Sequence, residues 1–140
     1  MNNILYLLAL SAVLLPGPPK PAITGQQGEE VRIDARGIAP ITGELLSADH
    51  RYLVVLFNEV SARSIGQNRS QPTIVYVYYE IIDRLRVGIN TFRARDLGTG
   101  VEYPRLRQYS RYPQGISQDE IEQIMEEYEQ EDLYEIRSRL

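Results

Sequence analysis

The chain has 140 residues, no cysteine and a formal net charge of −4. This length accommodates one domain with short appendages. The absence of cysteine excludes disulfides, zinc–thiolate sites, iron–sulfur clusters, thiol nucleophiles and lipid attachment at a cysteine. The negative net charge disfavours nucleic acid as the main partner. The charge is segregated, because residues 84–111 hold seven arginines and two acids, whereas residues 117–135 hold nine acids and no base.

An apolar run of twelve residues, ILYLLALSAVLL, occupies residues 4–15, and a proline-rich stretch follows at 16–21. As a helix the run would span about 18 Å, short of the roughly 30 Å hydrocarbon core of a membrane. Its length is typical of the apolar region of a secretory signal. The residues before it contain no lysine or arginine, and no small-residue cleavage site follows. An uncleaved membrane anchor and a core element of the domain therefore stay open as alternatives.

We expect residues 1–22 to form a signal peptide or N-terminal anchor, helical where it is apolar, joined to a short polyproline II linker. This segment predicts export to a bacterial cell envelope, with the protein either periplasmic or tethered to the inner membrane. Contact with a membrane is expected only through residues 4–15. A cytoplasmic location is the alternative.

Residues 29–58 predict three consecutive strands joined by two tight turns. Apolar and polar residues alternate over 29–35, which is typical of a half-buried strand. A turn at Arg36-Gly37 precedes a second strand over 40–48, in which Gly43 indicates a bulge or a sharp bend. After a turn at Asp49-His50, the segment RYLVVLFN at 51–58 is rich in β-branched and aromatic residues and predicts the third strand.

Two further strands are predicted downstream. Residues 59–71 are polar and irregular, and we expect them to form a loop. The segment PTIVYVYY at 72–79 predicts a fourth strand with both faces covered. A single helical turn at 80–82 then precedes a short fifth strand at 83–87.

This order of strands, with a bent second strand and a helical turn before the last, resembles the SH3-like or Sm-like small β-barrel. A strand reading G-x-L-x-x-x-D after a glycine turn is also similar to a pattern in uncharacterised bacterial envelope proteins. The resemblance covers about sixty residues and implies a fold without catalytic residues. The residues that carry it are Val31, Ile33, Gly37, the segment 41–49, the segment 53–56 and the segment 81–87.

The resemblance does not extend to RNA binding. Sm-like proteins bind RNA through an Asn- or Asp-bearing loop in mid-barrel and an Arg-Gly loop late in the barrel. The corresponding turns here are Asp49-His50 and the end of the segment 85–88, and neither matches those loops. The resemblance therefore implies the fold and not the ligand.

Arginines and aromatic residues interleave between residues 88 and 114. Such a mixture binds single-stranded nucleic acids through phosphate pairing and base stacking. An acidic segment follows directly, however, which favours a tail that wraps the barrel and is charge-paired within the molecule. A surface for a protein partner is the intermediate hypothesis. The candidate interaction residues are Arg93, Arg95, Tyr103, Arg105, Arg107, Tyr109, Arg111 and Tyr112.

Residues 117–130 predict an amphipathic helix. Ser117 and Glu120 have the spacing of a capping box, and Ile116 with Ile121 can form a hydrophobic staple. Apolar residues at 121, 124, 125 and 128 form one stripe, and glutamates occupy the other faces. Leu133, Ile136 and Leu140 continue an apolar spacing that predicts a second short helix.

The sequence offers no catalytic constellation. His50 is the only histidine and lies in a predicted turn, and no phosphate-binding loop or calcium-loop spacing is present. We therefore expect a non-enzyme without cofactor or metal: a binding or scaffolding module with an unknown protein partner. The first alternative is a cytoplasmic nucleic-acid binder that uses the 93–112 stretch. The second is a hydrolase without a recognisable site. Oligomerisation is compatible with each of these hypotheses.

The expected fold class is mainly β (α+β): a small five-stranded SH3-like or Sm-like barrel with a C-terminal amphipathic helix and an N-terminal apolar targeting helix. The expected parts are residues 1–22 for targeting and linker, 23–88 for the barrel, and 89–140 for the wrapping tail and acidic helix.

Overall fold

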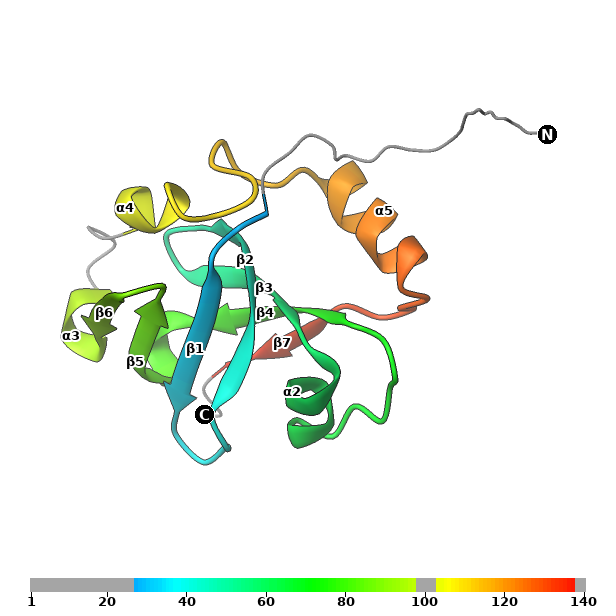
Figure 1. The fold of residues 1–140 in the computed structure, drawn as a ribbon, viewed down its shortest axis with the longest axis horizontal. Coiled ribbons are helices and arrows are strands. Elements are labelled where there is room, and N and C mark those ends of the chain that lie inside the picture. The colour runs from blue at the N-terminus through cyan, green and yellow to red at the C-terminus, as the bar shows by residue number, and fades with distance from the viewer. Residues whose placement is uncertain (1–26, 98–102, 138–140) are drawn as a thin grey trace.

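The computed structural model of the protein describes residues 27–97 and 103–137, which form a mainly β fold (Figure 1). One sheet of seven strands has the order β6-β5-β1-β2-β3-β4-β7, in which only β4 and β7 are parallel. The strands are β1 Glu30–Ala35, β2 Ile41–Ala48, β3 Tyr52–Phe57, β4 Thr73–Tyr78, β5 Ile82–Val87, β6 Asn90–Arg93 and β7 Tyr134–Ile136.

The helices are short, and they occupy the segments of the chain that connect the strands. A 3₁₀ turn, η1, spans Tyr79–Ile81 just before β5. The longest helix, α5, has the expected capping box: the Ser117 hydroxyl accepts from the backbone of Glu120, whose carboxylate accepts from the backbone of Ser117. The α-helices are α2 Glu59–Ser64, α3 Ala94–Leu97, α4 Tyr103–Arg107 and α5 Gln118–Glu127.

The sheet curls around a main core to which all strands contribute, and β6 and β7 form its two ends. The prediction of five strands closed into a barrel is wrong, because β6 and β7 extend the sheet and leave it open. The five predicted strand segments are confirmed within one or two residues. Gly43 allows β3 to approach β2 closely, because a Cβ at this position would lie 2.4 Å from the carbonyl oxygen of Leu56 on β3. The irregularity in β2 lies instead between Leu45 and Ser47.

Strands β3 and β4 are buried on both faces. One face contributes Leu53, Val55, Val75 and Val77 to the main core. The other face forms a second cluster with α5, in which Val54, Leu56 and Ile74 meet Ile121 and Ile124. This explains why the sequences of these strands are apolar at successive positions and not at alternate ones.

Two segments differ from expectation in their secondary structure. Residues 59–64, expected to be part of a loop, form α2, which begins at Asn58 as N-cap and buries Ser61 and Ala62. Residues 134–136, expected to be helical, form β7. The tail from residue 89 therefore does more than wrap the sheet, because it supplies the strands at both of its ends.

The predicted targeting segment, residues 1–22, lies outside the described residues. Within the part of the chain that the structure describes, no helix has both the length and the apolar character needed to cross a membrane.

Candidate anion-binding face

The outer face of β1, β5 and β6 carries four exposed arginines. Successive side chains of a strand point to opposite faces of the sheet. Val31, Ile33 and Leu85 are buried in the core, and the neighbouring residues along each strand lie on the outer face. The strand register then sets Arg32 of β1 opposite Arg86 of β5, and Arg84 of β5 opposite Arg93 of β6. We call this surface the arginine face, and its members are Arg32, Arg84, Arg86 and Arg93, with Asp34 and Thr91 beside them.

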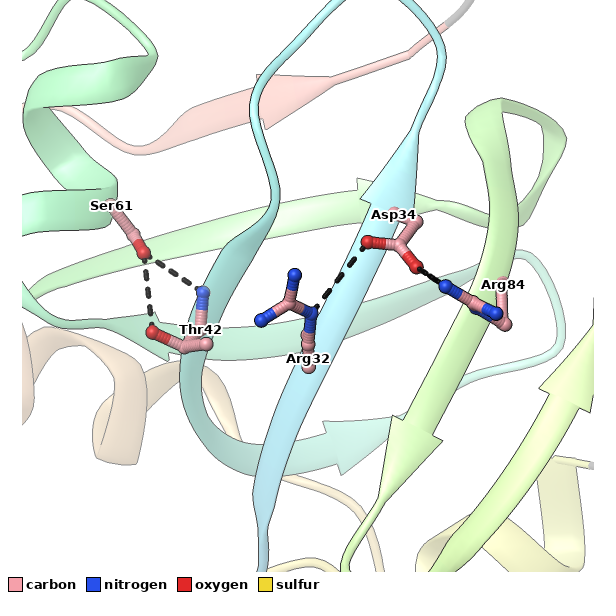
Figure 2. Close-up of polar contacts among 5 residues, drawn as sticks. All are labelled: Arg32, Asp34, Thr42, Ser61 and Arg84. Carbon is pink, nitrogen blue, oxygen red and sulfur yellow. Dashed lines mark hydrogen bonds and ion pairs between the residues drawn. The ribbon is translucent and has the colours of Figure 1, made fainter.

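Asp34 is the one acid within these paired positions. Its Oδ2 accepts from Arg84 Nε at 2.9 Å and lies 2.8 Å from Arg84 Nη2, and its Oδ1 lies 3.8 Å from Arg32 Nε. Figure 2 shows the carboxylate between the two guanidinium groups. This one carboxylate thus pairs with two of the four arginines, and the side chains of Arg32 and Arg84 remain 46% and 56% exposed.

The register places like charges directly opposite each other twice. Directly opposed like charges on neighbouring strands are destabilising, by up to about 1 kcal/mol per pair. The guanidinium groups of Arg86 and Arg93 form no ion pair with a carboxylate among residues 27–97 and 103–137, although Asp96 Oδ2 accepts from the backbone N–H of Arg93 at 3.2 Å. Fold stability therefore does not account for this arrangement, whereas a bound anionic group would offset the repulsion.

A surface hollow adjoins the arginine face. It has a volume of about 530 Å³ and is lined by Asp83, Arg84, Thr91, Arg93, Ala94 and Arg95. Arg95 reaches it from α3 and is exposed. Three of the six lining residues are arginines, so the hollow extends the positive surface beyond the sheet.

Most of the arginine–tyrosine stretch is engaged within the molecule. The Arg105 guanidinium lies over the Phe92 ring at 5.1 Å, and that of Arg107 lies over the Tyr103 ring at 5.3 Å. Arg107 Nε also donates to the carbonyl of Ala48 at 2.8 Å.

Residues 109–112 pack along β2 and against Asn90 of β6. The Tyr109 side chain packs on the main core, and its hydroxyl oxygen accepts from Asn90 at 3.2 Å. Tyr112 packs on the second cluster, and its burial raises the pKa of its hydroxyl. The backbone amides of Arg111 and Tyr112 donate to the carbonyls of Leu45 and Leu46.

Arg111 forms a two-pronged ion pair with Glu44. Its Nε donates to Glu44 Oε2 at 2.8 Å and its Nη2 donates to Glu44 Oε1 at 2.6 Å. The Glu44 side chain is 17% exposed, and it also accepts from the backbone of Gly28. These hydrogen bonds raise the pKa of Arg111 above its ordinary high value. Both charges are neutralised within the fold, so this arginine is not offered to a partner.

The eight residues predicted as one interaction surface therefore divide in the structure. Arg93 belongs to the arginine face and Arg95 lines the adjoining hollow, whereas Tyr103, Arg105, Arg107, Tyr109, Arg111 and Tyr112 contact the domain itself. Sequence reasoning missed Arg32, Arg84 and Arg86. The available signal was arginine at the polar positions of alternating strands, as in Arg84-Leu85-Arg86.

Other polar groups have structural roles. Ser61 is 3% exposed, and its Oγ accepts from the Thr42 backbone at 2.8 Å, which attaches α2 to β2 (Figure 2). Asn58 Oδ1 caps α2 by accepting from the Ser61 backbone. His50 is exposed in its turn, with Nδ1 2.6 Å from Asp49 Oδ1. The described residues contain no group of three or more His, Asp or Glu side chains that could hold a metal ion.

Comparisons of the chain with protein-family models, curated proteins and solved structures give no match.

Proposed function

We propose that the protein is a non-enzymatic binding module that takes an acidic protein partner on the arginine face. The observation that carries this proposal is the strand register, which sets Arg32 opposite Arg86 and Arg84 opposite Arg93. Guanidinium groups pair with carboxylates in a planar, two-pronged geometry, which suits surfaces that recognise acidic side chains. An acidic partner would replace the like-charge repulsion with ion pairs.

The surroundings of these arginines favour a protein over a single-stranded nucleic acid. Base recognition by such surfaces depends on aromatic rings available for stacking. Tyr103 and Tyr109 are packed against the core, and Tyr112 is packed on the second cluster. The exposed neighbours of the arginine face are Thr91, Asp83 and Ala94, which offer no ring.

The test is binding of the full chain to poly-L-glutamate and to single-stranded DNA at low and high salt. We expect poly-L-glutamate to bind in a salt-dependent manner. The double variant Arg86→Ala with Arg93→Ala would lose two surface ion pairs with the polyanion, of about 0.7 kcal/mol each. We therefore expect it to bind about tenfold more weakly. The matched control is Arg51→Ala with Arg63→Ala, which removes two exposed arginines from other surfaces and is expected to leave binding within about twofold.

Equal binding by both double variants would overturn the proposal. Tighter binding of single-stranded DNA than of poly-L-glutamate, lost with Arg105→Ala and Arg107→Ala, would instead support a nucleic-acid binder. Thermal unfolding of each variant shows whether the fold is retained.

We also propose that the module acts in a bacterial cell envelope, on the strength of the apolar run at 4–15 and the proline-rich stretch after it. A reporter enzyme that is active only outside the cytoplasm, fused after Ala22, is expected to be active. Cytoplasmic retention of the fusion would contradict export, and it would leave the arginine-face proposal to its own test.

A further inference from the structure

Strand β7 ends the sheet with one open edge. Tyr134, Glu135 and Ile136 pair in parallel with Val75–Val77 of β4, and no other strand among the described residues pairs with β7. A strand edge presents unpaired N–H and C=O groups that can pair with another chain. Proteins often prevent this with edge charges, so the sign and spacing of the charges decide what an edge can accept.

The side chains of β7 alternate between two environments. Tyr134 and Ile136 pack against the main core. Glu135 and Arg137 lie on the opposite face, 3.7 Å apart, with side chains 44% and 52% exposed. The Arg137 guanidinium also lies over the Tyr78 ring of β4 at 4.3 Å from its centroid. The outer face of this edge thus carries one acid and one base, two residues apart.

This arrangement is complementary to itself. In an antiparallel pair of two β7 strands centred on Ile136, a two-fold axis places Glu135 of each copy directly opposite Arg137 of the other. Opposite charges in directly opposed positions stabilise a strand pair, whereas an edge with charges of one sign would repel its own copy. We infer that a second copy of this chain binds here, through antiparallel pairing of the two β7 strands.

A groove with a mixed apolar and charged lining adjoins the same edge. It has a volume of about 580 Å³ and is lined by four isoleucines, Ile38, Ile65, Ile81 and Ile136, together with Arg36, Gly37, Glu135 and Arg137. In the antiparallel pair the two Ile136 side chains lie directly opposite each other. Apolar contact therefore accompanies the charge pairing on the outer face.

The size of the edge sets the expected strength of the dimer. A standard stable interface buries roughly 1,200–2,000 Å², and smaller contacts form weak, transient complexes. Three strand residues and part of a groove fall at the small end. The dimer is therefore reversible, and its population increases with protein concentration.

The experiment is sedimentation velocity of the full chain over a range of concentrations. We expect the wild type to shift from monomer toward dimer as concentration increases. Glu135→Arg and Arg137→Glu each place like charges opposite one another, and each is expected to weaken dimerisation at least about tenfold, the equivalent of 1.4 kcal/mol. An equimolar mixture of the two variants has only opposite charges across the heterodimer, so the mixture is expected to dimerise.

The control pair is Glu126→Arg on α5 and Arg51→Glu in the β2–β3 turn, which make the same charge changes away from the edge. These variants, alone or mixed, are expected to dimerise as the wild type does. Recovery in the mixture of the edge variants distinguishes a broken interface from a damaged fold, because damaged monomers would not dimerise on mixing. A wild type that stays monomeric at all concentrations, or a dimer indifferent to both edge variants, would overturn the inference.

Discussion

Tyr79 is a buried residue whose hydroxyl closes the turn between β2 and β3. It is 6% exposed, and its Oη donates to the carbonyl of Asp49 at 2.5 Å. Burial, with a smaller contribution from the charge of Asp49, raises the pKa of this hydroxyl well above its ordinary value of 10. The folded state therefore retains this proton at pH values at which the unfolded chain loses it.

The raised pKa of Tyr79 predicts a loss of stability in alkaline solution. Its contribution is complete below pH 10, where both states are protonated, and it decreases as the pH increases above that value. Tyr79→Phe is expected to cost about 1 kcal/mol at pH 7, because the Asp49 carbonyl loses its donor. Above pH 10 the free energy of unfolding of the variant is expected to decrease less steeply than that of the wild type. Urea unfolding from pH 7 to 11 measures both effects, and parallel curves would contradict the prediction.

The ion pair of Arg111 with Glu44 connects the tail to β2 near the first described residues. Both side chains are largely buried, at 24% and 17% exposed. Removing one partner leaves the other charge without its hydrogen bonds, which costs about 3 kcal/mol in buried pairs. We expect Glu44→Ala and Arg111→Ala each to lower the free energy of unfolding by about 2–3 kcal/mol. A double-mutant cycle is expected to yield a coupling energy of about 1–3 kcal/mol. Additive effects would show that the pair contributes through packing alone.

At the scale of elements, Gln130 connects the end of α5 to the edge of β4. Its Oε1 accepts from the backbone N–H of Ile74 at 2.7 Å. Its Nε2 donates to the carbonyls of Ile74 and Asp132 at 2.9 and 2.8 Å. The carboxamide thus takes the place of a neighbouring strand where β7 has not yet begun, and it is 6% exposed.

Gln130→Ala is expected to lower the free energy of unfolding by about 2–4 kcal/mol, because it leaves both backbone groups of Ile74 unpaired in a buried site. Gln123→Ala removes an exposed glutamine from α5 and is expected to change the free energy of unfolding by less than about 0.5 kcal/mol. Denaturant unfolding compares the two. A Gln130 variant as stable as the Gln123 variant would mean that water replaces the carboxamide.

The elements that can be predicted from the sequence are those with a local signal, such as a repeating pattern of apolar residues or a capping motif. The alternation in β1 and the capping box of α5 are local signals, and both are confirmed. Strand β7 was mistaken for a helix because Leu133 and Ile136 have helical spacing. Pairing with β4, residues 75–77, decides its structure instead, and that partner is almost sixty residues away. Helix α2 is six residues long, too short to show a period in a polar segment.

The same reasoning explains what was missed in the candidate site. The arginine face depends on pairing between β1 and β5, which sets Arg32 beside Arg86 although 54 positions separate them in the numbering. No local pattern contains that pairing. Arg105 and Arg107 look equivalent to Arg93 in the sequence, but aromatic rings next to them in space hold their side chains. The sequence therefore marks the arginine-rich stretches, and only the strand register shows which arginines lie side by side.

At the scale of the whole molecule, burial increases from the ends of the sheet to its middle. Strands β3 and β4 have neighbouring strands on both sides and are covered by the main core on one face and by the second cluster on the other. Strands β6 and β7 have one neighbour each; β6 contributes Arg93 to the arginine face, and β7 is the edge proposed to pair with a second copy. The middle of the sheet thus provides most of the stability, and its two end strands are the least buried.

This gradient predicts the order of amide hydrogen exchange. Amides of β3 and β4 have no open face or edge, so we expect them to exchange only through global unfolding. Amides of β7 pair along three residues and are expected to exchange faster, through local opening at the sheet edge. Gln130→Ala removes the attachment to β4 that lies next to β7. After correction for the global loss of stability, we expect this variant to speed exchange in β7 more than in β3. Exchange measured by NMR in the wild type and this variant tests the order. Equal protection of β7 and β3 would mean that the sheet opens as one unit.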